Sequence, residues 1–317
     1  MVKNLITVGL NPAIDCVVWC DGFLPGEVNS GKLVARIAAG KAANVTRALA
    51  LLGQDVLASG FLGECDWLFF KEQLHKLRPG AVACHFTILS QATRQNITLL
   101  HSDMETHIRL KGFEVQKTDI AAMEKYLKET VQAGDAVLFS GSLPAGLSAQ
   151  RFGDLLDVSL ALGALVAVDT AGEALTVALR RPLWIAKPNA EELAQAWGYG
   201  KLGTVADITA AAEKQACTVE NLIVSRGQLG ALLIRQRECY TGAVPPPEPV
   251  IRTVSCGDHL LAGFVHGLSQ GKAPMQALGV GLALATARAV SEDLEIFDSG
   301  KYSMFLEQVV VARVSII

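Results

Sequence analysis

The segment TVSCGDHLLAGF, residues 253–264, places one glycine and one aspartate where a polar run turns apolar. The apolar spacing after Gly257 predicts a helix, and the first amide groups of a helix have no partner within it, so they attract anions. Asp258 would lie beside such an anion, where its own negative charge competes with that of the anion. A carboxylate in a first helical turn also simply complements the helix dipole. This segment alone leaves both interpretations open.

Two further segments carry charge at places where a phosphate could bind. In AAGKAANVTRALALLG, residues 38–53, Gly40 and Lys41 precede an apolar-periodic helix that carries Asn44. Glycine lets the backbone approach a ligand closely, and the lysine adds a positive charge at the helix start. In SQATRQNITLL, Arg94 can grip a phosphate with two hydrogen bonds, or can merely be a solvated strand residue. Neither segment has the P-loop pattern.

The segment KPNAEELAQAWG, residues 187–198, predicts a strand-to-helix turn with three polar side chains. They are Lys187, Asn189 and Glu192. Asn189 suits a helix cap and Glu192 a first-turn carboxylate, so a purely structural role is as plausible as a ligand role.

Apolar β-branched runs alternate with helical periods along most of the chain, which predicts an α/β fold with a largely parallel sheet. Five buried strands are expected in NLITVGL (4–10), DAVLFSG (135–141), ALVAVDT (164–170), LWIAKPN (183–189) and NLIVSRG (221–227). Ligands bind beyond the carboxyl ends of strands in such sheets. The residues expected along one crevice are therefore Asp169, Lys187, Asn189, Ser225 and Gly227.

Two stretches break the alternation, at about 16–37 and 84–112. They contain short alternating runs such as ACHFTIL and RQNITLL, with no long helix between their strands. We expect antiparallel strands that form a small sheet outside the main sheet, placed over the crevice as a lid. No linker separates independent domains, so residues 1–317 are predicted to form a single domain with this lid inserted.

Composition excludes several classes of protein. The chain has 317 residues, of which 50% are hydrophobic and 19% charged, as in compact globular proteins. A net charge of −3 argues against nucleic-acid binding. No apolar run approaches the roughly 20 residues that span a bilayer, and no secretion signal is visible, so we expect a cytoplasmic protein. The seven cysteines are scattered without a CxxC, which favours reduced thiols. The six histidines form no metal signature.

The order of the motifs resembles the PfkB family of carbohydrate kinases over nearly the whole chain. The motifs are GLNPAID, AGKAANV, TRQNI, SGSLPAG, KPNAEEL, VSRGQLGALL and TVSCGDHLLAGF. The resemblance implies a ribokinase-like three-layer α/β/α fold and ATP-dependent phosphorylation. TRQNI, GFEV and SGSLPAG are most similar to the branch that phosphorylates hexose phosphates. The resemblance to this branch implies the conversion of fructose 1-phosphate to fructose 1,6-bisphosphate, with tagatose-6-phosphate kinase or 6-phosphofructokinase activity as alternatives.

The resemblance also implies roles for individual residues. Asp258 matches the catalytic base, and Cys256 and Gly257 match an anion hole for the transferred phosphoryl group. The sugar-binding positions are matched by Asp15, Gly40, Lys41 and Asn44, and the arginine that holds the substrate's phosphate by Arg94. The nucleotide-side positions are matched by Lys187, Asn189, Glu192, Ser225, Gly227 and Gly230. Mg²⁺ is expected to arrive with ATP near Asn189 and Glu192 without a direct protein metal site. A homodimer through the lid is also implied.

Two motifs depart from the family pattern. The usual Gly-Gly-Lys-Gly reads Ala39-Gly40-Lys41-Ala42, and the usual Gly-Ala-Gly-Asp-Ser reads Ser255-Cys256-Gly257-Asp258-His259. If Ser255 must adopt a conformation that suits glycine, the turn is strained. A thiol at Cys256 beside a helix start is expected to have a lowered pKa. The departures leave a non-catalytic sugar-phosphate sensor as the alternative of another class.

Overall fold

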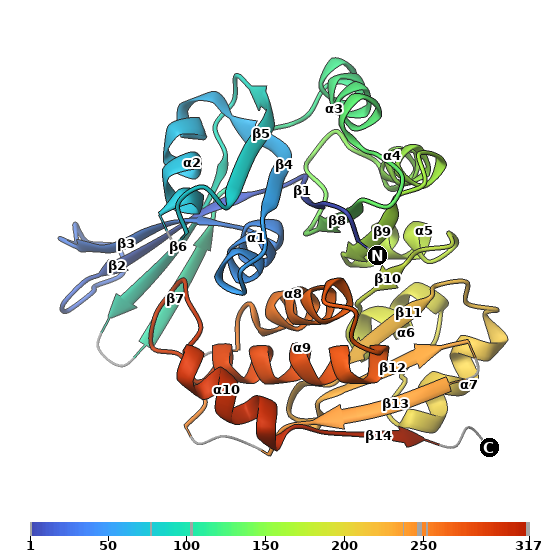
Figure 1. Ribbon diagram of the computed structural model, residues 1–317. Coiled ribbons are helices and arrows are strands. Elements are labelled where there is room, and N and C mark those ends of the chain that lie inside the picture. The colour runs from blue at the N-terminus through green and yellow to red at the C-terminus, as the bar shows by residue number, and fades with distance from the viewer. Residues whose placement is uncertain are drawn as a thin grey trace.

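The computed structural model describes residues 2–76, 78–101, 104–236, 238–245, 249–251 and 253–314. Most of the proline-rich run at 245–249 lies outside this range. Over the described residues the chain forms a large sheet between two layers of helices, with a small second sheet at one side (Figure 1). None of the described helices is long and apolar enough to cross a membrane.

The large sheet has the strand order β14-β13-β12-β11-β10-β9-β8-β1-β4-β5. The pairings from β5 through β11 are parallel, and those among β11, β12, β13 and β14 are antiparallel. Its strands are β1 (Leu5–Gly9), β4 (Val56–Gly63), β5 (Val82–Leu89), β8 (Ala136–Ser140), β9 (Leu165–Asp169), β10 (Ile185–Ala186), β11 (Asn221–Ser225), β12 (Ala231–Arg235), β13 (Glu238–Ala243) and β14 (Val310–Val314). All five strands expected from the sequence are present, and the mostly parallel sheet is confirmed.

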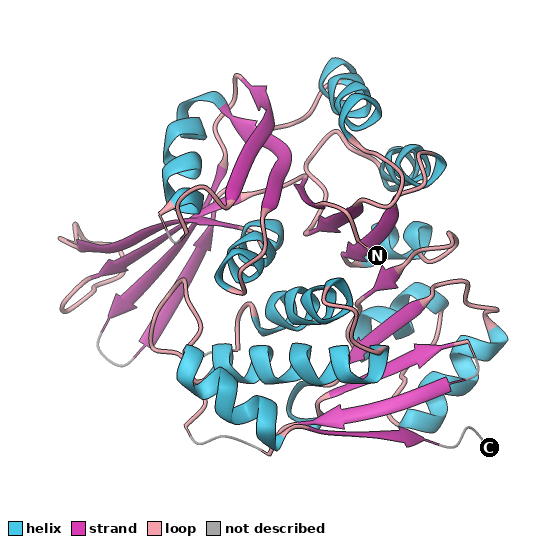
Figure 2. Cartoon of the chain, in the orientation of Figure 1, coloured by secondary structure: helices cyan, strands magenta, loops and turns pink. Residues whose placement is uncertain are grey.

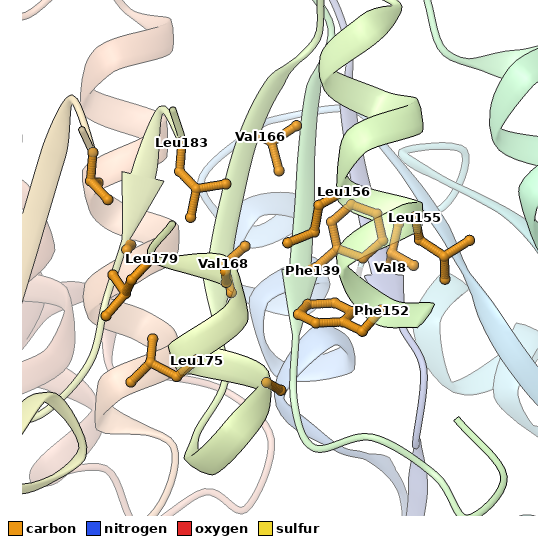
Figure 3. Packing of buried hydrophobic residues seen from close by; sticks show 14 of the residues in the cluster. Val8, Phe139, Phe152, Leu155, Leu156, Val166, Val168, Leu175, Leu179 and Leu183 are labelled. Atoms are coloured by element: carbon orange, nitrogen blue, oxygen red, sulfur yellow. The ribbon is translucent and has the colours of Figure 1, made fainter. Parts of the chain in front are cut away.

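Each face of the large sheet is covered by its own group of helices. One face packs against α3 (Lys117–Thr130), α4 (Ala149–Ala161), α5 (Gly172–Ala178), α6 (Ala190–Trp197) and α7 (Val205–Lys214). The other packs against α1 (Lys41–Leu51), α8 (Cys256–Ser269), α9 (Pro274–Ala289) and α10 (Ser299–Gln308). Figure 3 shows the first core, where Phe139 and Val168 of the sheet meet Phe152 of α4 and Leu175 of α5. Burying strands on both faces explains their almost continuous apolar sequences.

The small sheet has the strand order β3-β2-β6-β7 and projects from the side of the large one (Figure 2). Its strands are β2 (Ala13–Trp19), β3 (Lys32–Ala39), β6 (Arg94–His101) and β7 (Met104–Arg109). β2 pairs antiparallel with β3 but parallel with β6, so the sheet is mixed rather than purely antiparallel as expected. The chain leaves β1 for this sheet and returns from β3 into α1, which brings the start of α1 between the two sheets.

One strand expected in the small sheet belongs to the large one. The run ACHFTIL lies in β5, which pairs parallel with β4 from Val56 opposite Val82 to Gly63 opposite Leu89. The crossover between them is made by a 3₁₀ turn (Glu64–Asp66) and α2 (Trp67–His75), a helix of 9 residues. β5 is one of the two edge strands of the large sheet, and its partly exposed side chains alternate like those of a two-faced antiparallel strand.

Candidate active site

The turn that precedes α8 forms the centre of the site. Ser255 has φ +66° and ψ 0°, and the helix begins at the next residue, as the sequence predicts. The left-handed conformation confirms the strain expected for a non-glycine residue at this position. A Cβ built on Gly257 would lie 3.1 Å from Lys187 Nζ, so this glycine lets the ammonium group approach the helix start. Amide groups and a cation therefore converge where an anion would bind.

Asp258 lies in the first turn of α8 and is 5% exposed. Asn44 Nδ2, from α1, donates a hydrogen bond to Asp258 Oδ2 at 2.8 Å. Burial raises the pKa of Asp258 to about 7, and the nearby charge of Asp169 adds to the effect. The hydrogen bond from Asn44 and the charges of Lys187 and Lys41 lower this pKa in part. A carboxyl group with a pKa near neutrality is well matched to accept a proton in catalysis.

Asp169, at the carboxyl end of β9, binds two lysines. Its Oδ1 lies 2.7 Å from Lys41 Nζ and its Oδ2 lies 3.1 Å from Lys187 Nζ. Burial alone would raise the pKa of Asp169, but the charges of Lys187 and Lys41 outweigh burial and hold the pKa below its usual value. The sequence places Asp169 on the crevice but gives no sign that it bridges α1 and β10. Its role as a link between the two lysines was therefore missed.

The positions expected on the sugar side lie where the two sheets meet. Asp15 of β2 accepts a hydrogen bond from Asn96 Nδ2 of β6 at 2.7 Å. Gly40, which precedes α1, has φ +103°, and a Cβ there would lie 3.2 Å from Pro12 Cα, so only glycine fits without strain. A cavity at this place is lined by Gly40 and Lys41, among other residues. Asn96 was not among the expected site residues.

Arg94 begins β6 on the same side of the small sheet as Asp15. Its Nε donates to the backbone carbonyls of Asn11 and Pro12 at 3.3 and 3.2 Å. Burial lowers the pKa of Arg94, with Asp15 raising it and the charge of Arg109 lowering it further. Arg109, opposite Asn96 on β7, is a second cation that the sequence did not single out.

The positions expected on the nucleotide side lie at the ends of β10 and β11. Asn189 and Glu192 form a reciprocal capping box at the start of α6: Glu192 N donates to Asn189 Oδ1 at 2.7 Å, and Asn189 N donates to Glu192 Oε2 at 2.8 Å. Asn189 and Glu192 therefore have the structural role of a helix cap, which the sequence left open. Asn189 also bridges to Ser225 of β11, which brings these positions together.

Two glycines shape the turn after β11. Gly227 has φ +59°, and Gly230 has φ +76° with a notional Cβ 2.0 Å from Gly242 O. Neither position accommodates a side chain without strain.

Among the described residues no group of three or more His, Cys, Asp or Glu could hold a metal ion. The cap uses Oε2 of Glu192, and a carboxylate has further acceptor sites, so Glu192 fits a contact to a metal that arrives with a nucleotide.

The expectation of a lowered pKa for the Cys256 thiol is wrong. Burial raises the pKa of Cys256 to about 11, with only partial opposition from the charge of Arg288. Removal of the thiolate from water outweighs the attraction of the helix start.

Comparison with known proteins decides the family. The model of the pfkB family carbohydrate kinases matches residues 2–294. The chain belongs to this family. A pfkB kinase transfers phosphate from ATP to a sugar. The ribokinase-like fold and the enzymatic class expected from the sequence are thereby confirmed.

Several relatives cover almost the whole pfkB chain. 1-Phosphofructokinase of Escherichia coli is 31% identical over 98% of both chains. Tagatose-6-phosphate kinase of Staphylococcus epidermidis is 28% identical over 98% of this chain and 100% of its own. Phosphofructokinase-2 of Escherichia coli, solved with potassium, superposes with a TM-score of 0.88 at 22% identity, over 97% of this chain and 99% of that one. The last likeness concerns the fold alone.

Proposed function

We propose that this pfkB kinase transfers the γ-phosphoryl group of ATP to a hydroxyl of a hexose phosphate, with fructose 1-phosphate giving fructose 1,6-bisphosphate. The observation that carries the proposal is the buried carboxyl of Asp258, held by Asn44 in the first turn of a helix, where backbone amides attract anions. A base and an anion site side by side are what phosphoryl transfer to an alcohol requires.

This geometry supports the following course for the proposed reaction. Asp258 takes the proton of the sugar hydroxyl as its oxygen attacks the γ-phosphorus, and the bond from that phosphorus to the β-phosphate oxygen breaks to release ADP. The amide groups of Cys256 and Gly257 stabilise charge on the transferred group. Lys187, beside Gly257, adds a positive charge there.

Asp169 orients the cations of the site. Because one buried carboxylate binds both Lys41 and Lys187, the sugar-side and nucleotide-side lysines keep fixed positions. Bound ATP supplies Mg²⁺, which offsets the charge of its phosphates. Asn189 and Glu192 are the residues proposed to lie near that ion, and their mutual hydrogen bonds keep them oriented.

The substrate's own phosphate is assigned to Arg94. The bonds from its Nε to two carbonyls fix the guanidinium and leave its terminal nitrogens to face a ligand. Arg109 lies near enough for its charge to affect Arg94, and such a concentration of positive charge suits a phosphorylated sugar better than a free one. The curated relatives named 1-phosphofructokinase favour fructose 1-phosphate, and those named tagatose-6-phosphate kinase make tagatose 6-phosphate the second candidate.

The test is a coupled assay of ADP release with MgATP over a panel of free sugars and sugar phosphates. We expect turnover on hexose monophosphates, with the highest kcat/KM for fructose 1-phosphate. A preference for tagatose 6-phosphate or fructose 6-phosphate would change the substrate within the proposed class. Higher kcat/KM on a free sugar would overturn that class, and binding without any turnover would indicate a sensor.

A homodimer through the small sheet remains part of the proposal, together with a cytoplasmic location. Leu33 and Val34 of β3 and Ile108 of β7 expose about half of their surfaces. These side chains lie on the two edge strands of the small sheet, and exposed apolar surface favours association. Light scattering should give the mass of two chains, and Ile108→Asp should shift it to one. A monomeric parent at micromolar concentration would contradict this assignment.

A further inference from the structure

Arg288, near the end of α9, contacts the turn before α8. Its Nε donates a hydrogen bond to Ser255 Oγ at 2.9 Å, and the arginine is buried. Ser255 is the left-handed residue of that turn. A residue with a Cβ adopts this conformation at an energetic cost that glycine avoids. The bond from Arg288 therefore acts on a residue whose backbone needs support.

His259 forms hydrogen bonds to the backbone carbonyl of Ser255. Its backbone N lies 3.1 Å and its Nδ1 2.9 Å from Ser255 O. Burial lowers the pKa of His259 to about 3, so its ring is neutral. Because a carbonyl only accepts hydrogen bonds, Nδ1 must carry the ring proton. Ser255 is thus held at its side chain by one helix and at its carbonyl by another.

Three further bonds of the Arg288 guanidinium organise the segment after α9. Arg288 Nη1 donates to the carbonyls of Asp293 and Ile296 at 2.6 and 3.2 Å, and Nη2 donates to that of Leu294 at 2.9 Å. One buried side chain therefore connects this turn to the turn that contains Ser255.

The same segment reaches the base by a separate route. Glu295 lies 3.8 Å from Arg47 Nε, and Arg47 Nη1 donates to Asn44 Oδ1 at 3.1 Å. Asn44 in turn donates to Asp258. The turn at 293–296 therefore lies between the groups that hold Ser255 and those that hold the base.

We propose that Arg288 is a positioning residue for phosphoryl transfer. By holding Ser255 in its left-handed conformation, it directs the amide groups of Cys256 and Gly257 toward the transferred group. The inference rests on the proposed anion hole. Its characteristic consequence is that glycine at position 255 would make the hydrogen bond from Arg288 unnecessary, because glycine adopts the conformation unaided.

The experiment is a set of steady-state measurements on Ser255→Ala, Ser255→Gly, Arg288→Met and the double variant Ser255→Gly/Arg288→Met. Ser255→Ala removes the hydroxyl but keeps the strained backbone, so we expect kcat to fall about fivefold or more. Ser255→Gly should stay within about threefold of the parent, since it removes the strain together with the bond. KM for ATP and for the sugar phosphate should change little in both.

The double variant separates positioning from mere stability. We expect Arg288→Met to lower kcat about tenfold alone, but less than about threefold when added to Ser255→Gly. Thermal melting should show a similar loss of stability in both backgrounds, and Thr286→Ala on the same helix should leave kcat unchanged.

An equal loss of kcat in the two backgrounds would overturn the proposal, as would Ser255→Ala behaving like Ser255→Gly. If Arg288→Met fails to fold, the two Ser255 variants still decide the question, because they leave Arg288 in place. A parent without turnover on any sugar would instead refute the proposed function.

Discussion

The free energy of unfolding should depend on pH through Asp258, because its carboxyl group is buried in the folded protein. Burial raises the pKa of this group from 3.8 to about 7, so the folded chain holds the proton more tightly than the unfolded chain. The stability that this adds is fully present below about pH 4 and is lost as the pH rises through 7. Asp258→Asn is neutral at every pH, and its amide oxygen can still accept the bond from Asn44, so it should avoid the loss.

The magnitude follows from the shift. Three pKa units at 1.36 kcal/mol each amount to about 4 kcal/mol above pH 7, of which about 2 to 3 kcal/mol is lost between pH 5 and pH 8. Urea denaturation of the parent and of Asp258→Asn at these two pH values measures it. The variant's advantage in unfolding free energy should grow by that amount from pH 5 to pH 8.

A matched control is Asp21→Asn, which alters an exposed carboxylate. It should change the unfolding free energy by less than about 0.5 kcal/mol at either pH. The reasoning would be refuted if the advantage of Asp258→Asn stayed constant or shrank as the pH rose, because the buried carboxyl would then not be harder to ionise than one in water.

Three further outcomes are expected. Arg94→Ala should weaken sugar-phosphate binding by about 1.5–3 kcal/mol with little change in the KM for ATP. The control variant Arg151→Ala should alter neither quantity. If Arg94→Ala binds the sugar phosphate as tightly as the parent, Arg94 does not hold the substrate's phosphate. Gly40→Ala should lower the unfolding free energy by about 1–3 kcal/mol, because φ is +103° and the added Cβ meets backbone at 3.2 Å; an unchanged melting curve would contradict this. Iodoacetamide at pH 7 should label exposed Cys65 well before Cys256, whose pKa is about 11, and peptide mapping that shows the reverse order would be inconsistent with its burial.

Local patterns were sufficient to predict five of the ten strands of the large sheet and the starts of α1 and α8. The strands β1, β8, β9, β10 and β11 are buried on both faces, so their apolar runs are easily recognised, and their polar ends mark the crevice. β5 was misplaced because an edge strand is only partly buried and because the helix of its crossover is short. A nine-residue helix gives a weak periodic signal, whereas the alternation of an edge strand resembles that of a two-faced sheet.

The contacts that organise the site join residues far apart in the sequence, which local patterns do not reveal. Lys41 meets Asp169 across 128 positions, and Asn44 meets Asp258 across 214. The pKa of Cys256 was expected to fall because the helix start is visible in the sequence, whereas the burial that raises it depends on packing around the turn. The strain at Ser255 was foreseen from its residue type, but the arginine that supports it, Arg288, lies 33 residues away.

The most direct test of the central claim is the steady-state turnover of Asp258→Asn with MgATP and fructose 1-phosphate. A general base contributes roughly 10²–10⁴-fold in rate, so kcat should fall by that factor while KM for the sugar phosphate stays within a few-fold. The parent should also lose kcat/KM as the pH falls below about 7, where the carboxyl takes up its proton. Near-normal turnover by Asp258→Asn would contradict the assignment of this carboxylate as the base.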